Sequence, residues 1–293
     1  MGVSPDLLSV VVRALAFVAL FQATGIAFFM ALFGRTLSSA QPAIRRLGLI
    51  AAAAGALLML AHLSLDASRM AGGFSGVWDP DLQKLAWSSK SGISQIAQIA
   101  GLLVILAALA FSPRRGATLA GSAGALMAIG AFLLTGHTSV HPLRFVLTPL
   151  LALHLLVVAF WFGALIPLVL VTRLEPAAAT ARIVQRFSAI AVLLVPLIVI
   201  AGLAMAALLS GSFGVLRTPY GQLLLVKLAG FIVLLLLAAY NRWRLTPALS
   251  LGGTAPDGAA AAGALRRSIA AEYLLIVAVL GVTAVLTAFF SPH

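Results

Sequence analysis

Histidine is the residue in this chain best suited to chemistry, because imidazole is a common metal ligand and is costly to place in hydrocarbon. The sequence holds five histidines and no cysteine. On the span boundaries that hydropathy gives, all five lie in or just above the same half of a bundle of membrane spans. This pattern predicts a metal or haem site that is entered from that side. The five are His62, His137, His141, His154 and His293.

The composition indicates a polytopic membrane protein. Apolar residues make up 62% of the chain and charged residues only 9%, and the apolar runs are longer than a water-soluble core helix needs. We predict an all-α fold, a single membrane domain over residues 1–293 with a bundle of eight transmembrane helices. The predicted spans are residues 8–33, 47–68, 92–111, 117–138, 145–171, 187–210, 219–240 and 268–290.

The basic residues of the loops orient this bundle. The loops after spans 1, 3, 5 and 7 hold twelve arginines, and the opposite loops hold five basic residues. Arginine-rich loops stay in the cytoplasm, so we expect an inner-membrane protein with both termini in the periplasm. The net charge of +12 is then a topology signal and does not indicate nucleic-acid binding. The twelve are Arg35, Arg45, Arg46, Arg114, Arg115, Arg173, Arg182, Arg186, Arg242, Arg244, Arg266 and Arg267; the five are Arg69, Lys84, Lys90, Arg144 and Arg217.

Two loops have a distinct composition. In the outer loop 69–91, Asp79 and Pro80 suit the N-cap and first turn of a short helix, and Trp78 and Trp87 suit a segment at the lipid headgroups. The stretch 252–263 is rich in glycine and alanine and predicts a flexible cytoplasmic loop.

Two of the histidines are predicted at matching depth. His62 lies about 12 Å below the outer end of span 2, and His154 lies about 13 Å along span 5, at 1.5 Å per residue. Both are then well inside a hydrocarbon layer of about 30 Å. We expect the two imidazoles to share one site, although hydrogen bonds between helices are an alternative role for them.

Other polar groups are expected in the same outer half. Met59, His62 and Asp66 are spaced i, i+3, i+7 and share one helix face. Lys227 is predicted at comparable depth in span 7, which makes an Asp66–Lys227 ion pair plausible. In the inner half, Glu272 is the embedded carboxylate, which either favours a helix N-terminus or pairs with Arg266 or Arg186.

The other candidates have alternative roles that need no ligand. His137 ends span 4 and His141 follows one turn later, where histidine also favours a helix C-terminus. His293 reads as a disordered terminal residue. Methionines such as Met59 are also common core fillers.

A series of short motifs in the second half carries a family resemblance. It consists of GHT at 136–138, LHLLVVAFWFGAL at 153–165, RFS at 186–188, TPYG at 218–221, LLLVK ending at Lys227 and NRWRLTP at 241–247. In this order and spacing, over roughly residues 135–290, the series resembles the CopD family of bacterial copper resistance membrane proteins.

The resemblance implies an eight-span inner-membrane protein of copper uptake, which is not an enzyme and takes copper from a periplasmic carrier similar to CopC. By position, His137 and His154 fall in motifs of that family. We therefore expect copper, as Cu(I) or Cu(II), to be bound by side chains that suit either state and imported from periplasm to cytoplasm. The expected ligands are His154 and His137, which fall in those motifs, and His62, Asp66, Met59 and His141, which rest on their predicted positions and not on the resemblance.

Two other functions remain open from the sequence. His62 and His154 could instead be the axial ligands of a haem b in a membrane oxidoreductase. A partner that only receives copper for assembly or sensing is a further alternative. The chain has no phosphate-binding G-x-x-x-x-G-K-[ST] loop, so no nucleotide is expected to drive transport. The lipid bilayer is the one partner that all three functions share.

Overall fold

Eight long helices form the protein. The computed structural model describes residues 4–111, 115–136, 140–210, 217–252 and 256–289, and these ranges contain no strand. Eight helices within them are long and apolar enough to cross a membrane, so the predicted all-α, multi-pass fold is confirmed. The first four are α1 (Pro5–Phe33), α2 (Gln41–Met70), α4 (Lys90–Ala110) and α5 (Arg115–Gly130), which the 3₁₀ turn η3 (Ala131–Leu134) extends. The last four are α7 (Arg144–Leu174), α8 (Ala177–Ser210), α9 (Pro219–Tyr240) and α11 (Pro256–Phe289).

Short elements join the spans. They are η1 (Gly34–Thr36), η2 (Phe74–Trp78), α3 (Pro80–Ser88), the π-helical turn η5 (Asn241–Leu245) and α10 (Thr246–Gly252). As predicted, α3 begins after Asp79, whose Oδ1 accepts hydrogen bonds from the amides of Asp81 at 3.0 Å and Leu82 at 3.1 Å. Trp78 and Trp87 are exposed beside it, which suits contact with lipid headgroups.

The predicted loop 252–263 is wrong. Helix α10 continues to Gly252 and α11 already begins at Pro256. Proline is favoured in the first turn of a helix, and the alanines that follow have the highest helix propensity. Glycine content therefore misled the prediction, because alanine outweighs it in this stretch.

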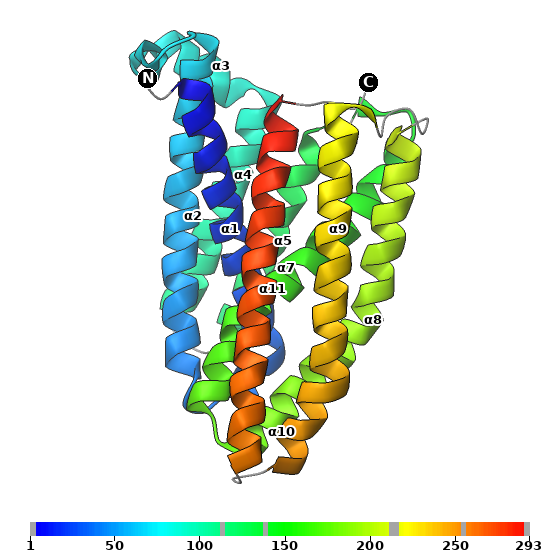
Figure 1. Cartoon of the computed structure of the whole chain (residues 1–293). Helices are drawn as coiled ribbons and strands as arrows, with labels where there is room; N and C mark the ends of the chain where they lie inside the picture. The colour runs from blue at the N-terminus through cyan, green and yellow to red at the C-terminus, as the bar shows by residue number, and fades with distance from the viewer. Residues whose placement is uncertain (1–3, 112–114, 137–139, 211–216, 253–255, 290–293) are drawn as a thin grey trace.

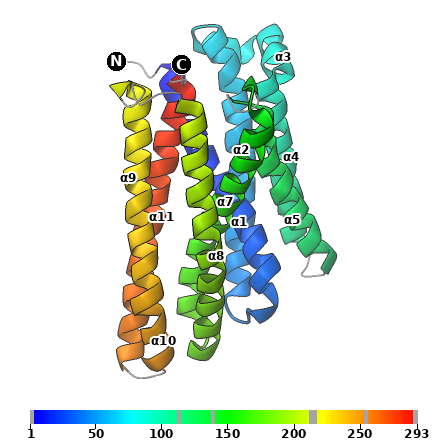
Figure 2. The same ribbon diagram turned by 90° about the vertical axis from the view of Figure 1, so that its right-hand side faces the viewer.

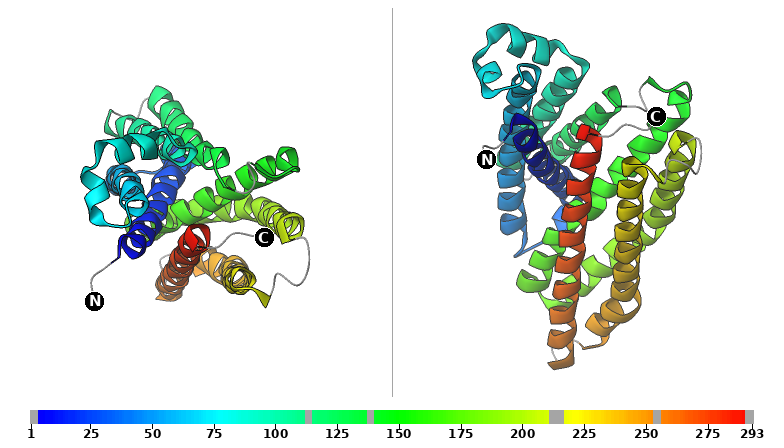
Figure 3. Two further views of the ribbon diagram at one scale, coloured as in Figure 1. Left: turned by 90° about the horizontal axis from the view of Figure 1, so that it is seen from above. Right: turned by 45° about the horizontal axis from the view of Figure 1, so that its top comes forward.

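The helices form two groups, and α7 lies between them. Figure 2 shows α1, α2, α4 and α5 on one side and α8, α9 and α11 on the other, with α7 between them; the view from above in Figure 3 shows the same division. Helix α1 packs on α2, α5, α7 and α11. In the most apolar part of α1 and of α7, 61% of residues are buried, against 11% in α8 and 6% in α9. Helices α1 and α7 are thus the core, and α8 and α9 present most of their surface to the surroundings.

The two ends of the bundle differ. Helix α3, the start of α1 and the end of α11 lie at one end, and α10 lies at the other (Figure 1). The first is called the outer end below and the second the inner end.

Helices α1 and α7 touch through their backbones. The side-chain amide of Gln22 donates to the carbonyl of Gly163 at 3.0 Å. A Cβ atom on Gly25 would lie 2.1 Å from the carbonyl oxygen of Ala159. Glycine is required at this position because any larger residue would prevent the backbones of α1 and α7 from approaching this closely.

Glu175 joins the two inner loops that follow α1 and α7. Its carboxylate accepts hydrogen bonds from the amide of Ser38 at 2.8 Å, the hydroxyl of Ser38 at 2.6 Å and the amide of Ala40 at 2.9 Å. Burial opposes ionisation of this carboxyl, but the bonds from Ser38 and Ala40 outweigh it and hold the pKa of Glu175 below its ordinary value.

This anchor predicts a pH-dependent contribution to stability. A carboxyl with a lowered folded-state pKa stabilises the fold above its unfolded pKa, and the contribution is lost as pH falls through the folded value. In thermal unfolding of the detergent-solubilised protein, Glu175→Gln should lower stability at pH 7 by about 1–3 kcal/mol. Because the variant has no carboxylate to protonate here, the gap to wild type should narrow as pH falls from neutral into the acid range in which Glu175 is protonated, and a gap that stays constant with pH would contradict the anchor.

Candidate metal site

The outer half of α2 carries a polar stripe that faces into the first helix group. Met59 and His62 are buried, with 2% and 4% of their surface exposed, and both line one cavity. Asp66 follows one turn later and is partly exposed. Met59 and His62 therefore lie on one helix face, as predicted, and both line the cavity. Asp66 does not line it.

A chain of hydrogen bonds fixes the orientation of His62. The Nδ1 atom of His62 lies 2.8 Å from Oε1 of Gln95 on α4. The Nε2 group of Gln95 donates to Oδ2 of Asp66 at 2.8 Å and lies 3.3 Å from Oγ of Ser91. Because a carboxylate can only accept, the amide nitrogen of Gln95 must face Asp66 and its oxygen must face His62.

The tautomer of His62 follows from this chain. An amide oxygen accepts only, so Nδ1 of His62 carries the proton, and in the neutral ring Nε2 keeps a free lone pair. Nε2 is buried and has no hydrogen-bond partner. A buried ring nitrogen left free, with the other nitrogen held by a polar chain that ends in a carboxylate, is the arrangement typical of a metal-ligating histidine.

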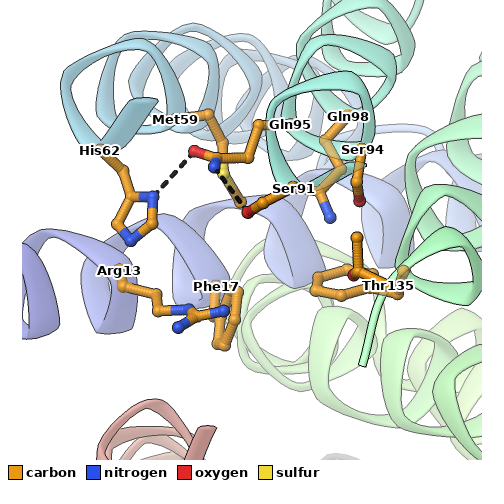
Figure 4. A pocket seen from close by; sticks show the side chains of 10 residues that line it. Arg13, Phe17, Met59, His62, Ser91, Ser94, Gln95, Gln98 and Thr135 are labelled. Atoms are coloured by element: carbon orange, nitrogen blue, oxygen red, sulfur yellow. Dashed lines mark hydrogen bonds between the residues drawn. The ribbon is translucent and has the colours of Figure 1, made fainter. Parts of the chain in front are cut away.

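The cavity beside His62 is small and mostly polar. Its volume is about 40 Å³, which is room for one ion or for very few water molecules. Figure 4 shows His62 bonded to Gln95 on one wall and the Arg13 side chain reaching across below them. The lining residues are Arg13 and Phe17 of α1, Met59 and His62 of α2, Ser91, Ser94, Gln95 and Gln98 of α4, Phe132 of η3, and Thr135.

Two arginines surround the carboxylate of this site. Arg69 Nη1 lies 3.9 Å from Oδ1 of Asp66, and Arg69 Nε lies 2.9 Å from Oδ1 of Asp6. Arg13 acts on both His62 and Asp66 electrostatically and packs over the Phe17 ring. In the described ranges Lys227 makes no ion pair with Asp66, so that predicted pair is wrong. The two residues lie in different helix groups, which equal depth alone does not reveal.

His154 has separate surroundings in the second group. Its Nδ1 is buried without a hydrogen-bond partner and faces Gly202 of α8, where a Cβ would lie 4.0 Å away. Lys227 of α9 is near enough to act on it electrostatically. His154 does not line the His62 cavity, and within the described ranges no three histidine, aspartate or glutamate side chains gather as a metal site.

Of the remaining predicted ligands, His141 lies in the described turn before α7. Nδ1 of His141 accepts a hydrogen bond from the amide of Leu143 at 3.1 Å, so this nitrogen is used within its own turn. His137 and His293 lie outside the described residues.

Sequence reasoning missed several residues of the cavity. The polar residues of α4 are spaced i, i+3, i+4 and i+7 and so form one stripe on an otherwise apolar span. That stripe was the available signal for a polar site on this helix. The residues missed are Arg13, Ser91, Ser94, Gln95, Gln98 and Thr135.

Known protein families match this chain in both helix groups. A family model described as copper resistance protein D matches residues 181–286, and one described as the N-terminal domain of proteins like copper resistance protein D matches residues 4–142. The copper resistance protein D of Pseudomonas syringae pv. tomato is 30% identical over 303 residues, which covers 95% of this chain and 95% of that protein. No solved structure matches. The likeness extends over the first three spans, where the sequence motifs gave no resemblance, and the 4–142 match contains the His62 cavity.

Proposed function

The chain belongs to the copper resistance protein D family, and from this premise we propose that it binds copper at His62 and passes the ion from the periplasm towards the cytoplasm. The free Nε2 of His62 is the observation that carries the proposal. It is a buried nitrogen ligand in a cavity of ionic size, within a chain whose relatives are named for copper resistance. We expect the protein in the bacterial inner membrane and, as a carrier of ions, without enzymatic activity.

The charges of the cavity favour Cu(I) as the ion. Cu(I) accepts imidazole and thioether in low coordination, and the buried His62 and Met59 line the same cavity. Arg13 on the opposite wall repels a bound cation, and the repulsion is half as large for Cu(I) as for Cu(II) at the same distance. Asp66 then acts through Gln95 as the residue that orients His62.

His154 supplies a second nitrogen ligand for passage. Because its surroundings are separate from the His62 cavity, we propose that the two histidines serve successive positions of the ion. His141 lies nearer the outer end and, together with His137, which the sequence predicts at the end of span 4, suits an entrance that takes copper from a periplasmic carrier similar to CopC. Movement between weak sites suits conduction, because each site must release its ion.

A haem function lacks a supporting observation. A porphyrin needs a slot between two axial ligands, whereas the cavity at His62 measures about 40 Å³ and His154 is not on its wall. Absorption spectra of the purified protein test this directly, because a strong Soret band would favour haem.

Uptake by proteoliposomes tests the proposal. With Cu(I) held reduced outside, vesicles containing the protein in the proposed orientation should accumulate copper faster than empty vesicles. Reporter fusions fix the orientation: a fusion near Gly258 should read cytoplasmic and one after His293 periplasmic. Purified protein without copper, or a reversed reporter pattern, would contradict uptake by this route.

A further inference from the structure

A buried carboxylate in the inner half of the bundle has a structural environment that the copper site does not explain. Glu272 of α11 is 2% exposed. Its Oε2 accepts a hydrogen bond from the indole Nε1 of Trp161 at 3.3 Å, and its Oε1 contacts the amide nitrogen of Asn241. Trp161 belongs to α7 and Asn241 to the π-helical turn η5, so three elements converge on this carboxyl group.

Among the described residues, no Lys, Arg or His forms an ion pair with this carboxyl group. The ion pairs within the described ranges involve His62, Asp66, Arg69 and Asp6 only, so the expected pairing of Glu272 with Arg266 or Arg186 is wrong. Three charged or titratable groups on the neighbouring elements contact other residues. Arg242 of η5 donates to Ser188 at 2.9 Å, Arg186 of α8 lies over the Phe33 ring, and Tyr273 of α11 stacks on Phe162 of α7.

An unpaired carboxylate at this depth is costly, and a proton removes that cost. Transfer of an ionised carboxyl group into an apolar interior is so unfavourable that the group tends to neutralise. The burial of Glu272 and the neutral character of both its partners therefore favour the protonated acid.

Asn241 can adapt to either form of the acid. Its Oδ1 is buried and has no partner, while its amide nitrogen faces Glu272. Rotation of the amide by half a turn would place Oδ1 against the carboxyl, where it accepts a hydrogen bond from the protonated form. The residue stands at the start of a π-helical turn, a feature that often marks functional sites.

The donor set is unfavourable for Cu(I) at this carboxyl group. An indole N–H can only donate, so a cation at Oε2 would face the positive end of the N–H dipole. Hard amide and carboxylate oxygens are also poor ligands for Cu(I). A proton suits the group because it requires no additional ligand.

One face of α7 runs from His154 in the outer half to Trp161, the partner of Glu272. His154 and Trp161 are spaced i, i+7 on α7, so they lie on one face about 10 Å apart along the axis. Lys227 of α9 and Asn241 of η5, the turn that directly follows α9, are close to four helical turns apart. The second helix group thus carries ionisable or polar side chains near His154 and again near Glu272.

We propose that Glu272, held by Trp161 and Asn241, is a proton-binding site that takes up and releases one proton at the inner half of the bundle. Uptake adds the proton to a carboxylate oxygen, and release returns it to water at the inner end. Proton binding stands independently of copper, whereas a role of this proton in driving transport rests on the proposed copper function.

Infrared difference spectroscopy of the full chain in lipid nanodiscs tests proton binding. The wild type should keep a carboxylic acid C=O band at neutral pH, where exposed carboxyl groups are ionised, and should lose it at higher pH. Glu272→Gln should remove that band. Glu175→Gln is the matched control, since Glu175 is already ionised at neutral pH, and should leave the band in place.

A second variant keeps the test decisive if Glu272→Gln fails to fold. Trp161→Phe removes a hydrogen bond that favours the ionised form, so the pH at which the acid band disappears should rise. The absence of an acid band at neutral pH, its survival in Glu272→Gln, or an unmoved titration in Trp161→Phe would each overturn the proposal.

Measurements of copper uptake distinguish a failure of the proton site from a failure of the proposed copper function. In proteoliposomes, Glu272→Gln should retain copper binding at His62 and lose the dependence of uptake on a pH gradient. If the wild type binds a proton at Glu272 but carries no copper, the proton site stands and the copper function fails. If uptake by Glu272→Gln keeps its full dependence on the pH gradient, the role of the proton in transport is overturned.

Discussion

Substitution of His62 by alanine is expected to abolish copper binding by the purified protein. The imidazole is buried, its Nε2 is the free ligand atom of the cavity, and no other histidine among the described residues lines that wall. Water in a cavity of about 40 Å³ is a poor replacement for a nitrogen ligand of Cu(I). Copper content by elemental analysis and Cu(I) affinity by competition with a chromogenic chelator measure the loss.

Graded variants distinguish ligation from orientation. Gln95→Leu keeps His62 but frees its Nδ1, so copper affinity should fall about 10–100-fold. Asp66→Asn should have a smaller effect, because an asparagine oxygen still accepts from the Gln95 amide. His141→Ala is the control, since that ring is engaged in its own turn, and should retain occupancy.

His154→Ala separates the two histidine positions. If they serve successive steps, this variant should keep copper at His62 and lose uptake. Wild-type occupancy and uptake in both His62→Ala and His154→Ala, at normal expression, would refute the assignment of ligands.

The sequence was a sound guide to the number and order of the membrane spans. Long apolar runs predicted the eight spans, because hydrocarbon tolerates little else. Residue counting placed His62 within the outer part of α2, where the structure has it buried. The N-cap at Asp79 was also predicted correctly, because an N-cap depends only on residues that are close in the chain.

The sequence was a poor guide to which helices meet. Depth gives a residue its height but not the direction in which its helix face points, and this direction depends on packing between distant spans. His62 faces α1 and α4, whereas His154 faces α8, so equal height did not place them on one cavity wall. The search for histidine and carboxylate also passed over Gln95, because an uncharged amide gives no charge or metal-ligand signal.

Substitution of Gly25 by alanine is expected to prevent stable folding of the bundle. The added Cβ would lie 2.1 Å from the carbonyl oxygen of Ala159 and 2.4 Å from Cα of Gly163. Both are backbone atoms, so no side-chain rotation relieves the overlap, and α1 and α7 must separate. Overpacking costs about 1–3 kcal/mol where neighbours can move, and the cost should exceed this range at a contact between two backbones.

Separation of α1 from α7 in Gly25→Ala should also disturb the proposed copper site. Helix α1 carries Arg13 and Phe17 of the cavity wall and packs on α7 through Gly25, so a shift of α1 opens the cavity. Thermal unfolding and size-exclusion profiles in detergent should show strong loss of the folded monodisperse species. Gly281→Ala is the matched control within a span, because nothing lies within 4 Å of its added Cβ, and replacement of a helical glycine by alanine should leave stability unchanged or raised by up to about 1 kcal/mol. Equal melting temperatures for the two variants would show that α1 and α7 do not meet through their glycines in the folded protein.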